Sequence, residues 1–351
     1  MDRALYSIRP YTESDLEAEV RIDTAVDPLH PHTLEELRHW IETATTGVGH
    51  VSLRFAAADR RTGAVVAYGV VQHTSFNFHP LKFELYVAVH PDFQGQGIGR
   101  ELYAALENEV LQRSAICLWS MVRENEPRAV RFMEQSGFVP RRKAWRSRLD
   151  VARADLSKFP DRTRPMADRG IVLTTLAEEG RERPEVRQRA FRLCTAASAD
   201  VPRMGEYSPV SFEEFVEFDL NGPGALPDAY FLARRGDEYV GSTVMDRDLA
   251  EPDTLQVGFT GTHPGFRGLG IASELKRRAV EYARTRGYRF LLTNNDSLNH
   301  PIWAINERLG FRPETTWIQG EKELVPRTPT SVPSGRSPGE GHSRPQKDPQ
   351  G

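Results

Sequence analysis

The sequence is poor in cysteine and has little excess charge of either sign. Its 351 residues include two cysteines, Cys117 and Cys194, and carry a formal net charge of −3. Two cysteines at unrelated positions indicate neither a disulfide framework nor a cysteine-based metal site, and no metal is expected. The nearly balanced charge gives no electrostatic reason to expect a nucleic acid or an anionic membrane as partner.

Long apolar runs are also absent from the sequence. No run approaches the roughly 20 residues that a membrane-spanning helix needs, and the first residues, MDRALY, lack the apolar segment of a signal peptide. We therefore expect a protein of the cytoplasm. Because 39% of the residues are hydrophobic, the chain can bury two cores of roughly 150 residues each.

One stretch of the sequence occurs twice. The pattern His-Pro-x-Phe-x-Gly-x-Gly-Ile-x-x-Glu-Leu fits residues 90–102 and 263–275, which are 173 positions apart. The Gly-Phe pairs at 137–138 and 310–311 keep the same separation. A register held over some fifty positions indicates a duplicated domain. We predict one domain over residues 1–150, a linker over 151–168, a second domain over 169–324 and a disordered, proline-rich tail over 325–351.

Local patterns predict similar elements in both copies. Thr12 with Asp15, Thr33 with Glu36, and Ser211 with Glu214 have the spacing of capping boxes and predict helix starts. Apolar periodicity predicts the remaining elements. These are strands over 5–9, 51–58, 64–74, 85–89, 116–122, 138–149, 171–176, 230–234, 240–245 and 254–262, and helices from 98, over 127–136 and over 184–198.

The repeated stretch combines the end of a strand, a glycine-rich loop and the start of a helix. The free N–H groups of a first helical turn and the positive end of the helix dipole attract anions, and glycines let a ligand approach the backbone. The sequence therefore predicts a phosphate-bearing ligand. A dinucleotide fingerprint needs another glycine spacing and an acidic residue about twenty positions later, and a P-loop needs Gly-Lys-Ser/Thr, so neither motif fits.

These motifs resemble the GNAT superfamily of acyl-CoA-dependent N-acyltransferases. The residues that match the family pattern are Val89, Pro91, Gln94, Gly97, Gly99, Ala129, Phe132, Gly137 and Phe138 in the first copy, and Pro264, Arg267, Gly270, Ala272, Gly310 and Phe311 in the second. The resemblance implies a mixed α/β (α+β) fold of two tandem GNAT-like domains. Each would have a mostly antiparallel mixed sheet with a parallel, splayed central strand pair, flanked by helices.

The resemblance also implies acetyl-CoA as cosubstrate. The diphosphate would lie on the loops formed by Gln94, Gly95, Gln96, Gly97, Ile98 and Gly99, and by Arg267, Gly268, Leu269, Gly270, Ile271 and Ala272. The pantetheine arm would pair with the backbone near Val87 and Val89, or near Thr260 and Thr262, and would contact Asn125 and Asn299 at later helix starts. We expect each chain to bind two cofactor molecules.

In this family the amine attacks the thioester directly, so one group must accept a proton and another must protonate the thiolate. Glu84 on the central strand is the predicted base, although a solvated strand glutamate is the alternative reading. Many relatives place a tyrosine four residues before the Gly-Phe pair as the acid, but here Met133 and Asn306 occupy that position. Asn306 can only hydrogen-bond the sulfur or the pantetheine arm. The thiolate would then take its proton from water or from the attacking amine.

Several other polar residues favour structural roles. His90 and His263 precede prolines, where loop bonding or packing is favoured over catalysis, and Asp246, Asp248 and Asp253 fit turns at strand ends. The arginine-rich strand that ends the first copy fits either a solvated sheet edge or an anion site. Residues 200–209 have no counterpart in the first copy and fit either a substrate-shaping loop or a packed connector.

The expected function is acetyl transfer from acetyl-CoA to a primary amine, with a small molecule as partner and a monomer or homodimer as assembly. A metabolite, an antibiotic and a protein N-terminus all remain open as acceptors. The alternative is that one or both copies bind acyl-CoA without catalysis, as a sensor or scaffold.

Overall fold

The computed structural model describes residues 5–44 and 47–325. Its first half contains strands β1 (Tyr6–Pro10), β2 (Ser52–Asp59), β3 (Val65–Gln72), β4 (Lys82–Val89), β5 (Cys117–Arg123) and β6 (Val139–Asp150), and helices α1 (Leu16–Val26), α2 (Leu34–Thr43), α3 (Ile98–Gln112) and α4 (Pro127–Gln135). The predicted elements of this half are all present. Residues 326–351, most of the predicted tail, lie outside the described residues, so disorder there stays a prediction.

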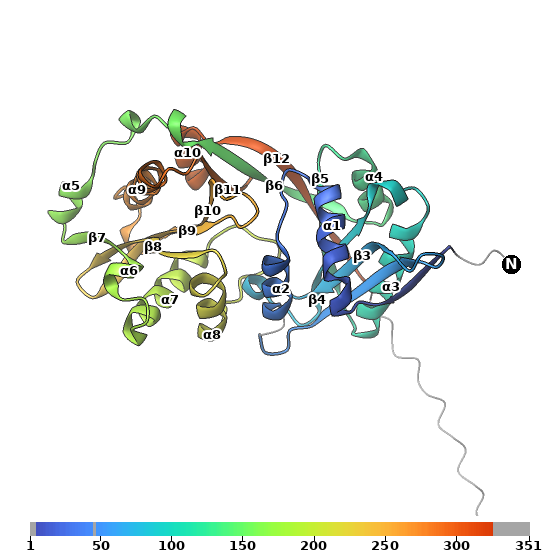
Figure 1. Ribbon diagram of the computed structural model, residues 1–351. Coiled ribbons are helices and arrows are strands. Elements are labelled where there is room, and N and C mark those ends of the chain that lie inside the picture. The colour runs from blue at the N-terminus through green and yellow to red at the C-terminus, as the bar shows by residue number, and fades with distance from the viewer. Residues whose placement is uncertain (1–4, 45–46, 326–351) are drawn as a thin grey trace, which may run out of the picture.

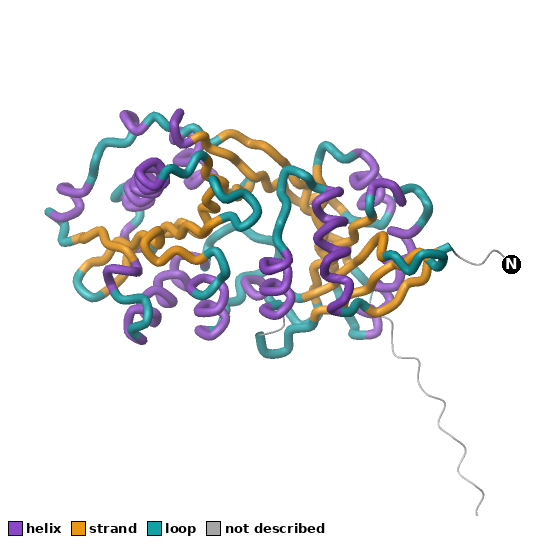
Figure 2. Tube along the Cα trace, viewed as in Figure 1, coloured by secondary structure: helices purple, strands orange, loops and turns teal. Residues whose placement is uncertain are grey.

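The second half repeats this order with more helical turns. Its strands are β7 (Ile171–Thr175), β8 (Ala225–Arg235), β9 (Glu238–Arg247), β10 (Thr254–Thr262), β11 (Phe290–Asp296) and β12 (Arg312–Glu323). Its helices are α5 (Thr163–Ala167), α6 (Leu176–Glu179), α7 (Pro184–Ser198), α8 (Phe212–Phe215), α9 (Ile271–Arg286) and α10 (His300–Leu309), with a π-helical turn at Val216–Leu220. Figures 1 and 2 show the two halves beside each other.

The capping boxes form as predicted. The Thr33 backbone N–H donates to the Glu36 carboxylate at 2.7 Å, and the Glu36 N–H donates to the Thr33 hydroxyl at 3.2 Å. Ser211 and Glu214 make the same reciprocal pair at the start of α8. These local bonds satisfy N–H groups that a helix start leaves free, which explains why the helix starts could be predicted from sequence.

The twelve strands of the described residues form one continuous sheet in the order β1-β2-β3-β4-β5-β12-β6-β11-β10-β9-β8-β7. The halves are joined by an exchange of their last strands. β12 pairs with β5 of the first half, and β6 pairs with β11 of the second half, while β6 and β12 pair with each other. Figure 1 shows both strands crossing the top of the molecule between the halves. No local pattern in the sequence predicts this exchange.

Each exchanged strand completes the core of the other half. Lys322 on β12 donates to the Tyr103 hydroxyl at 2.7 Å and pairs with Glu107 at 2.6 Å, both on α3. The segment predicted as a linker, residues 151–168, contributes Val151, Phe159 and Met166 to the buried core of the second half. The domain boundaries themselves stay predictions.

The sheet is mostly antiparallel, with one parallel pair in each half. β4 and β5 pair only from Lys82 to Glu84, and β10 and β11 pair only from Thr254 to Val257. Beyond these points each pair diverges and leaves backbone groups free on the facing edges. The predicted fold, a mixed sheet with a splayed central pair and flanking helices, is confirmed.

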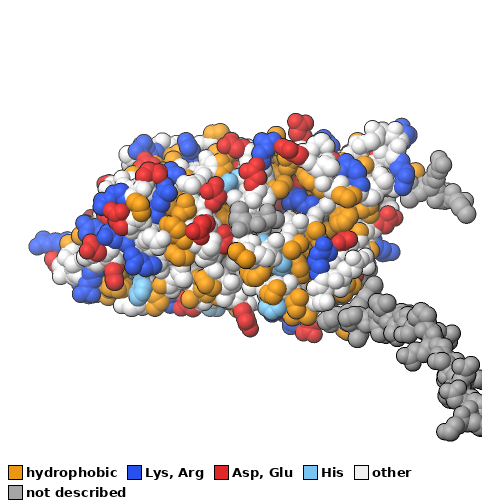
Figure 3. All heavy atoms as spheres, turned by 90° about the horizontal axis from the view of Figure 1, so that it is seen from below, with side chains coloured by type: hydrophobic (Ala, Val, Ile, Leu, Met, Phe, Trp, Pro, Cys, Tyr) orange, Lys and Arg blue, Asp and Glu red, His pale blue; other side chains and the backbone are white. Residues whose placement is uncertain are grey.

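The halves also touch below the sheet, where α2 contacts the π-helical turn that follows α8. The rings of His39 and Phe218 are 6.2 Å apart, and the Asn77 amide donates to the Met204 carbonyl at 2.6 Å. Residues 200–209 therefore pack against the first half. Figure 3 shows acidic and basic side chains interspersed over this lower face. Within the described residues, no helix combines the length and apolar character needed to cross a membrane.

Candidate active site

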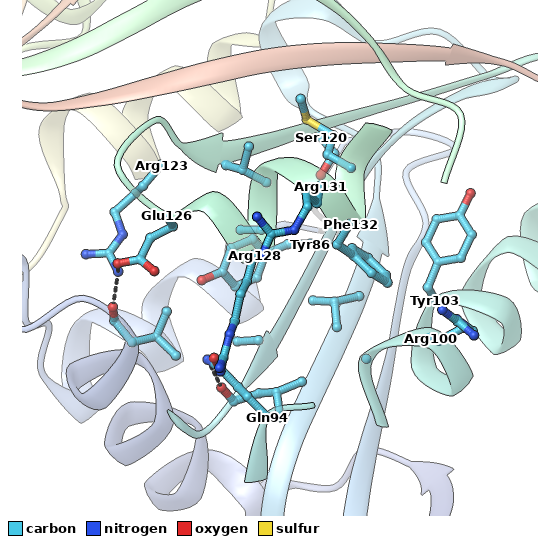
Figure 4. Close-up of a pocket in the computed structure, with 18 of the residues that line it drawn as sticks. Tyr86, Gln94, Arg100, Tyr103, Ser120, Arg123, Glu126, Arg128, Arg131 and Phe132 are labelled. Carbon is cyan, nitrogen blue, oxygen red and sulfur yellow. Dashed lines mark hydrogen bonds and ion pairs between the residues drawn. The ribbon is translucent and has the colours of Figure 1, made fainter. Parts of the chain in front are cut away.

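A cleft of about 780 Å³ opens in the first half where β4 and β5 diverge (Figure 4). Residues 85–89 of β4 and 120–123 of β5 form its two edges, and the glycine loop before α3 forms one end. α4 and the C-terminal end of α1 contribute to its walls, as does Trp317 from the exchanged strand β12. A slot between diverging strands offers unpaired backbone groups along its length, which suits an extended ligand.

The loop at the end of the cleft has a backbone that needs glycine. Gly95 and Gly97 have φ angles of 80° and 87°, a left-handed conformation that other residues adopt at a cost. Gly97 is the N-cap of α3, and a side chain at either glycine would project into open space. The N–H groups of the first turn of α3 are therefore open to an anion.

Three arginines surround the cleft without ion-pair partners within the described residues. Arg100 lies on the first turn of α3, and Arg128 and Arg131 lie on α4. Figure 4 shows the Arg128 side chain extending from α4 toward the side where Gln94 lies. Guanidinium groups bind phosphate through two parallel hydrogen bonds, so this rim suits a ligand with several phosphates. Sequence reasoning missed these residues because an arginine on an exposed helical face has no distinctive pattern.

The structure brings together most of the residues predicted to bind the cofactor in the first half. Val87, Val89, Gln94, Gly95, Gly97, Ile98 and Gly99 all line the cleft. Gln94 donates to the Val89 carbonyl at 3.1 Å and so closes the loop. Gln96 is outside the lining and accepts a hydrogen bond from Tyr6 at 2.6 Å, while Asn125 is exposed and its neighbour Glu126 lines the cleft instead.

Glu84, the predicted base, lies where the cleft begins. It is the last residue of β4 that pairs with β5, opposite Trp119, and the cleft lining starts at the next residue. Burial raises the pKa of the Glu84 carboxyl. Met133 is 2% exposed and faces Gly320 of β12, so it packs in the core. Tyr86, which was not singled out from the sequence, lines the cleft and offers a hydroxyl group, whose pKa is raised by burial.

A charged cluster closes the end of the cleft near α1. Asp27 accepts from His30 at 2.8 Å and from Arg123 at 3.2 Å. Burial alone would raise the pKa of Asp27, but the hydrogen bond from His30 and the charges of His30 and Arg123 hold it below its ordinary value. Asp27 is therefore a carboxylate at neutral pH, held by the His30 ring and the Arg123 guanidinium, and so a poor base.

The second half has the same loop geometry with its own residues packed around it. Gly268 and Gly270 have φ angles of 76° and 82°, as in the first half. Arg162, from the segment before β7, lies against Gly270, and a Cβ atom there would be 3.0 Å from the Arg162 side chain. Arg267 forms a two-bond ion pair with Asp200, in which Nη1 donates to Oδ2 at 2.5 Å and Nη2 donates to Oδ1 at 2.8 Å.

The other predicted residues of the second half occupy varied positions. Thr260 and Thr262 lie on β10 beyond its pairing with β11, Leu269 is half-buried, and Ile271 and Ala272 begin α9. Asn299 is the N-cap of α10 but makes no side-chain capping bond. Asn306 is fully buried and donates to Asn295 at 2.7 Å, which in turn donates to Ser147 of β6 at 2.9 Å. This network ties α10 to the exchanged strand.

The two histidines before the loops bond within them, as predicted. His90 and His263 each accept from a backbone N–H two residues later, at 3.4 and 3.3 Å. Asp248 fits its predicted turn role, because it accepts from the backbone N–H groups of Ala250 and Glu251.

Asp246 does not lie in a turn; it is within β9, beside a bulge of β10 between Val257 and Thr260. Burial raises the pKa of Asp246 to about 6 and, with the charge of Asp246, raises that of Asp219 to about 7. This pair of buried acids was missed because Asp219 lies on a π-helical turn far away in the sequence.

The comparisons with known proteins agree with this geometry. The model of the Acetyltransferase (GNAT) family matches the chain twice, over residues 16–138 and 194–311. A mycothiol acetyltransferase of Streptomyces bingchenggensis is 26% identical over 285 residues, covering 81% of this chain and 82% of the relative. One of Pseudarthrobacter chlorophenolicus is 25% identical over 233 residues, covering 66% of this chain and 67% of the relative.

Solved structures share the fold. A tandem GNAT protein from the clavulanic acid biosynthesis pathway superimposes with a TM-score of 0.70 at 19% identity, covering 92% of this chain and 100% of the other. A GCN5-related N-acetyltransferase from Sphaerobacter thermophilus superimposes with a TM-score of 0.67 at 20% identity, covering 92% of this chain and 96% of the other. At 19% and 20% identity, the similarity to these structures supports a shared fold and nothing more.

Proposed function

The chain belongs to the Acetyltransferase (GNAT) family, and from this premise we propose that it transfers an acetyl group from acetyl-CoA to a primary amine of a small molecule. It is an acyl-CoA-dependent N-acyltransferase of tandem GNAT architecture. Beyond family membership, we propose where acetyl-CoA binds, which class of amine accepts the acetyl group and which residues transfer protons.

The observation that carries the proposal is the first-half cleft. It combines a left-handed glycine loop at a helix N-terminus, two diverging strand edges and three arginines that have no ion-pair partner in the part of the chain that the structure describes. The loop N–H groups of residues 94–99 and the arginines would bind the phosphates of acetyl-CoA. The free backbone groups of Val87 and Val89 would hold the pantetheine arm, and a strand N–H would stabilise the negative charge that develops on the thioester oxygen.

The proton transfers follow from the side chains near the divergence of the strands. The amine nitrogen attacks the carbonyl carbon, the carbon–sulfur bond breaks, and the nitrogen must lose a proton. Glu84 is the proposed proton acceptor, because its raised pKa brings a carboxylate closer to the basicity that this step requires. Met133 cannot protonate the thiolate, so we assign that proton to the hydroxyl of Tyr86 or to water.

The direct test is release of free thiol from acetyl-CoA. We expect turnover with at least one member of a panel of small primary amines, including the substrate of mycothiol acetyltransferases, and the acetylated product should be detectable by mass spectrometry. Saturable binding of acetyl-CoA without thiol release on any amine would contradict transfer and favour a binding protein.

Replacing Glu84 with Gln is expected to lower kcat by roughly 100-fold or more, which is the usual contribution of a general base. The wild-type rate should fall as pH drops through the raised pKa of Glu84, because the carboxylate becomes protonated, and this acid limb should disappear in the variant. Rates measured between pH 5 and 9 check both points. Glu101→Gln, at an exposed site on α3, is the matched control. An unchanged kcat and pH profile in Glu84→Gln would assign the base elsewhere.

For the second half we propose a role as a scaffold, without acetyl transfer. Arg162 against Gly270 and the Arg267–Asp200 ion pair both compete with a diphosphate at that loop. Asn306 is fully buried in its network with Asn295, which suits a structural role better than contact with a thiolate.

A further inference from the structure

A second, smaller cavity lies in the first half, between helices α1 and α2 and strands β2 and β3. Its volume is about 180 Å³, several times the roughly 30 Å³ that a water molecule occupies in the liquid. We call it the α1–α2 pocket. The polar side chains that line it include Glu19 and Asp23 from α1, His32 from the following loop, Arg54 from β2 and Tyr68 from β3.

Two of these side chains present polar atoms that have no hydrogen-bond partner and no access to solvent. They are Glu19 Oε2 and Arg54 Nε. His32 Nε2 lies 3.3 Å from Asp23 Oδ2. Glu19 is 3% exposed, its other oxygen accepts a hydrogen bond from Arg54, and the Tyr11 hydroxyl also interacts with its carboxylate. A buried carboxylate oxygen without a donor costs free energy. A ligand that donates hydrogen bonds would remove that cost.

The charges in the pocket favour a cation. Two carboxyl groups, Glu19 and Asp23, face one guanidinium group, Arg54, and Asp23 accepts from the Tyr68 hydroxyl at 2.6 Å. Burial lowers the pKa of His32, although Glu19 and Glu36 oppose this, so its ring is neutral near pH 7. With both carboxyl groups ionised, the pocket has one negative charge in excess.

Aromatic rings add a second feature of a cation site. Trp40 lines the pocket while remaining 48% exposed, and its ring lies 5.2 Å from that of His32. Tyr68 forms part of the inner wall. Ring faces attract ammonium groups, most strongly when water is excluded.

The pocket adjoins the active-site cleft but is separate from it. The rings of Tyr68 and Tyr86 are 5.9 Å apart, with Tyr68 lining the pocket and Tyr86 lining the cleft. An ammonium group in the pocket would therefore lie one tyrosine pair away from the thioester. A small molecule could occupy both places only if it carried a second nitrogen for the reaction.

We propose that the α1–α2 pocket binds an ammonium group of the acceptor at a distance from the nitrogen that reacts, so that the acceptor is an aliphatic diamine or longer polyamine. The proposal deepens the proposed function and rests on it, because it takes the bound amine to be the acceptor of the acetyl group. The pocket itself is tested by binding alone.

The binding test is calorimetric titration of the full chain with 1,4-diaminobutane, without acetyl-CoA. We expect saturable binding that is at least tenfold weaker in Glu19→Gln and in Asp23→Asn, and unchanged in Glu17→Gln, an exposed acid on the same helix. The uncharged 1,4-butanediol should not bind. Absence of binding by the wild type, or equal affinity in the three variants, would overturn the proposal.

The affinity should also depend on pH. Burial raises the pKa of Asp23 to about 7, with Glu19 and Asp27 raising it further and Tyr68 and Arg54 opposing. Alkylamines, like the lysine side chain with a pKa near 10, stay charged over this range. A cation needs the carboxylate, so binding should strengthen roughly tenfold from pH 6 to pH 8 and be lost as pH falls through about 7. A flat profile over this range would overturn the role of Asp23.

Two further measurements separate this proposal from a folding defect and from the proposed function. Trp40→Ala changes a half-exposed side chain and should weaken binding severalfold at an unchanged urea midpoint. In the thiol-release assay, Glu19→Gln should raise KM for the diamine and leave kcat nearly unchanged. If diamine binding depends on Glu19 and Asp23 but the protein shows no turnover, acetyl transfer is contradicted and the pocket is retained. If the diamine is turned over and its KM is unchanged in Glu19→Gln and Asp23→Asn, the pocket is contradicted and acetyl transfer is retained.

Discussion

Replacing Gly97 with Trp is expected to lower the affinity of the first-half cleft for acetyl-CoA by at least 100-fold. Gly97 has a φ of 87° and a Cβ atom there would point into open space, where the diphosphate is expected. The indole ring would fill that space, and the left-handed backbone would cost a further 1–2 kcal/mol or so. Isothermal titration of acetyl-CoA into the purified proteins measures both affinity and stoichiometry.

Two variants control this experiment. Gly97→Ala has the same backbone strain without the bulk of the ring, so it should lose less affinity than Gly97→Trp. Gly270→Trp makes the equivalent change in the second half, where Arg162 already lies over the glycine. We expect it to leave the first-half site intact and to remove any second site seen in the wild type. Full affinity in Gly97→Trp, together with loss of binding in Gly270→Trp, would place the donor site in the second half.

The sequence predicted features that are set by neighbouring residues. Thr33 and Glu36 form their capping box within four positions, and Gly97 and Gly270 take the left-handed conformation that glycine favours. The parallel strand pairs that diverge after Glu84 and Val257 followed from a resemblance carried by closely spaced residues. Most of the predicted first-half cofactor residues line one cleft, because a strand, loop and helix that are contiguous in sequence form it.

Features that depend on partners distant in sequence could not be predicted. Arg128 and Arg131 resemble ordinary solvent-exposed helix residues until α4 is placed beside the cleft. Glu19 and Arg54 are on separate elements, and only the packing of α1 against the sheet brings them together. Their significance depends on which groups remain unpaired after folding, which no local pattern records.

The exchange of β6 and β12 also depends on partners that are distant in sequence, and it could not be predicted either. The two strands are equivalent members of the repeat, so each has a pattern that can pair with either β5 or β11. Residues 151–168 follow β6 directly and bury Val151, Phe159 and Met166 in the second half, which favours the pairing of β6 with β11. A repeat of domains in the sequence therefore does not establish that the domains are separate in space.

Cutting the chain between its halves is therefore expected to leave a single stable particle. A protease site inserted after Asp168, in an exposed turn, would give one fragment with β1 to β6 and another with β7 to β12. β6 would still lie between β11 and β12, and β12 between β5 and β6. We expect the cut fragments to elute together on gel filtration without denaturant, and to separate in urea.

The same exchange predicts how the fragments behave alone. The first fragment without β12 exposes the edge of β5 and loses the contacts of Lys322 with Tyr103 and Glu107, so it should aggregate or pair with a second copy. Mixing the two fragments should restore the particle, and its Tm should rise with concentration because folding is then bimolecular. The uncut protein carrying the same site, with a Tm independent of concentration, is the control. Fragments that elute apart as folded monomers would show that each half can use its own last strand, because β6 would then have left β11 for β5.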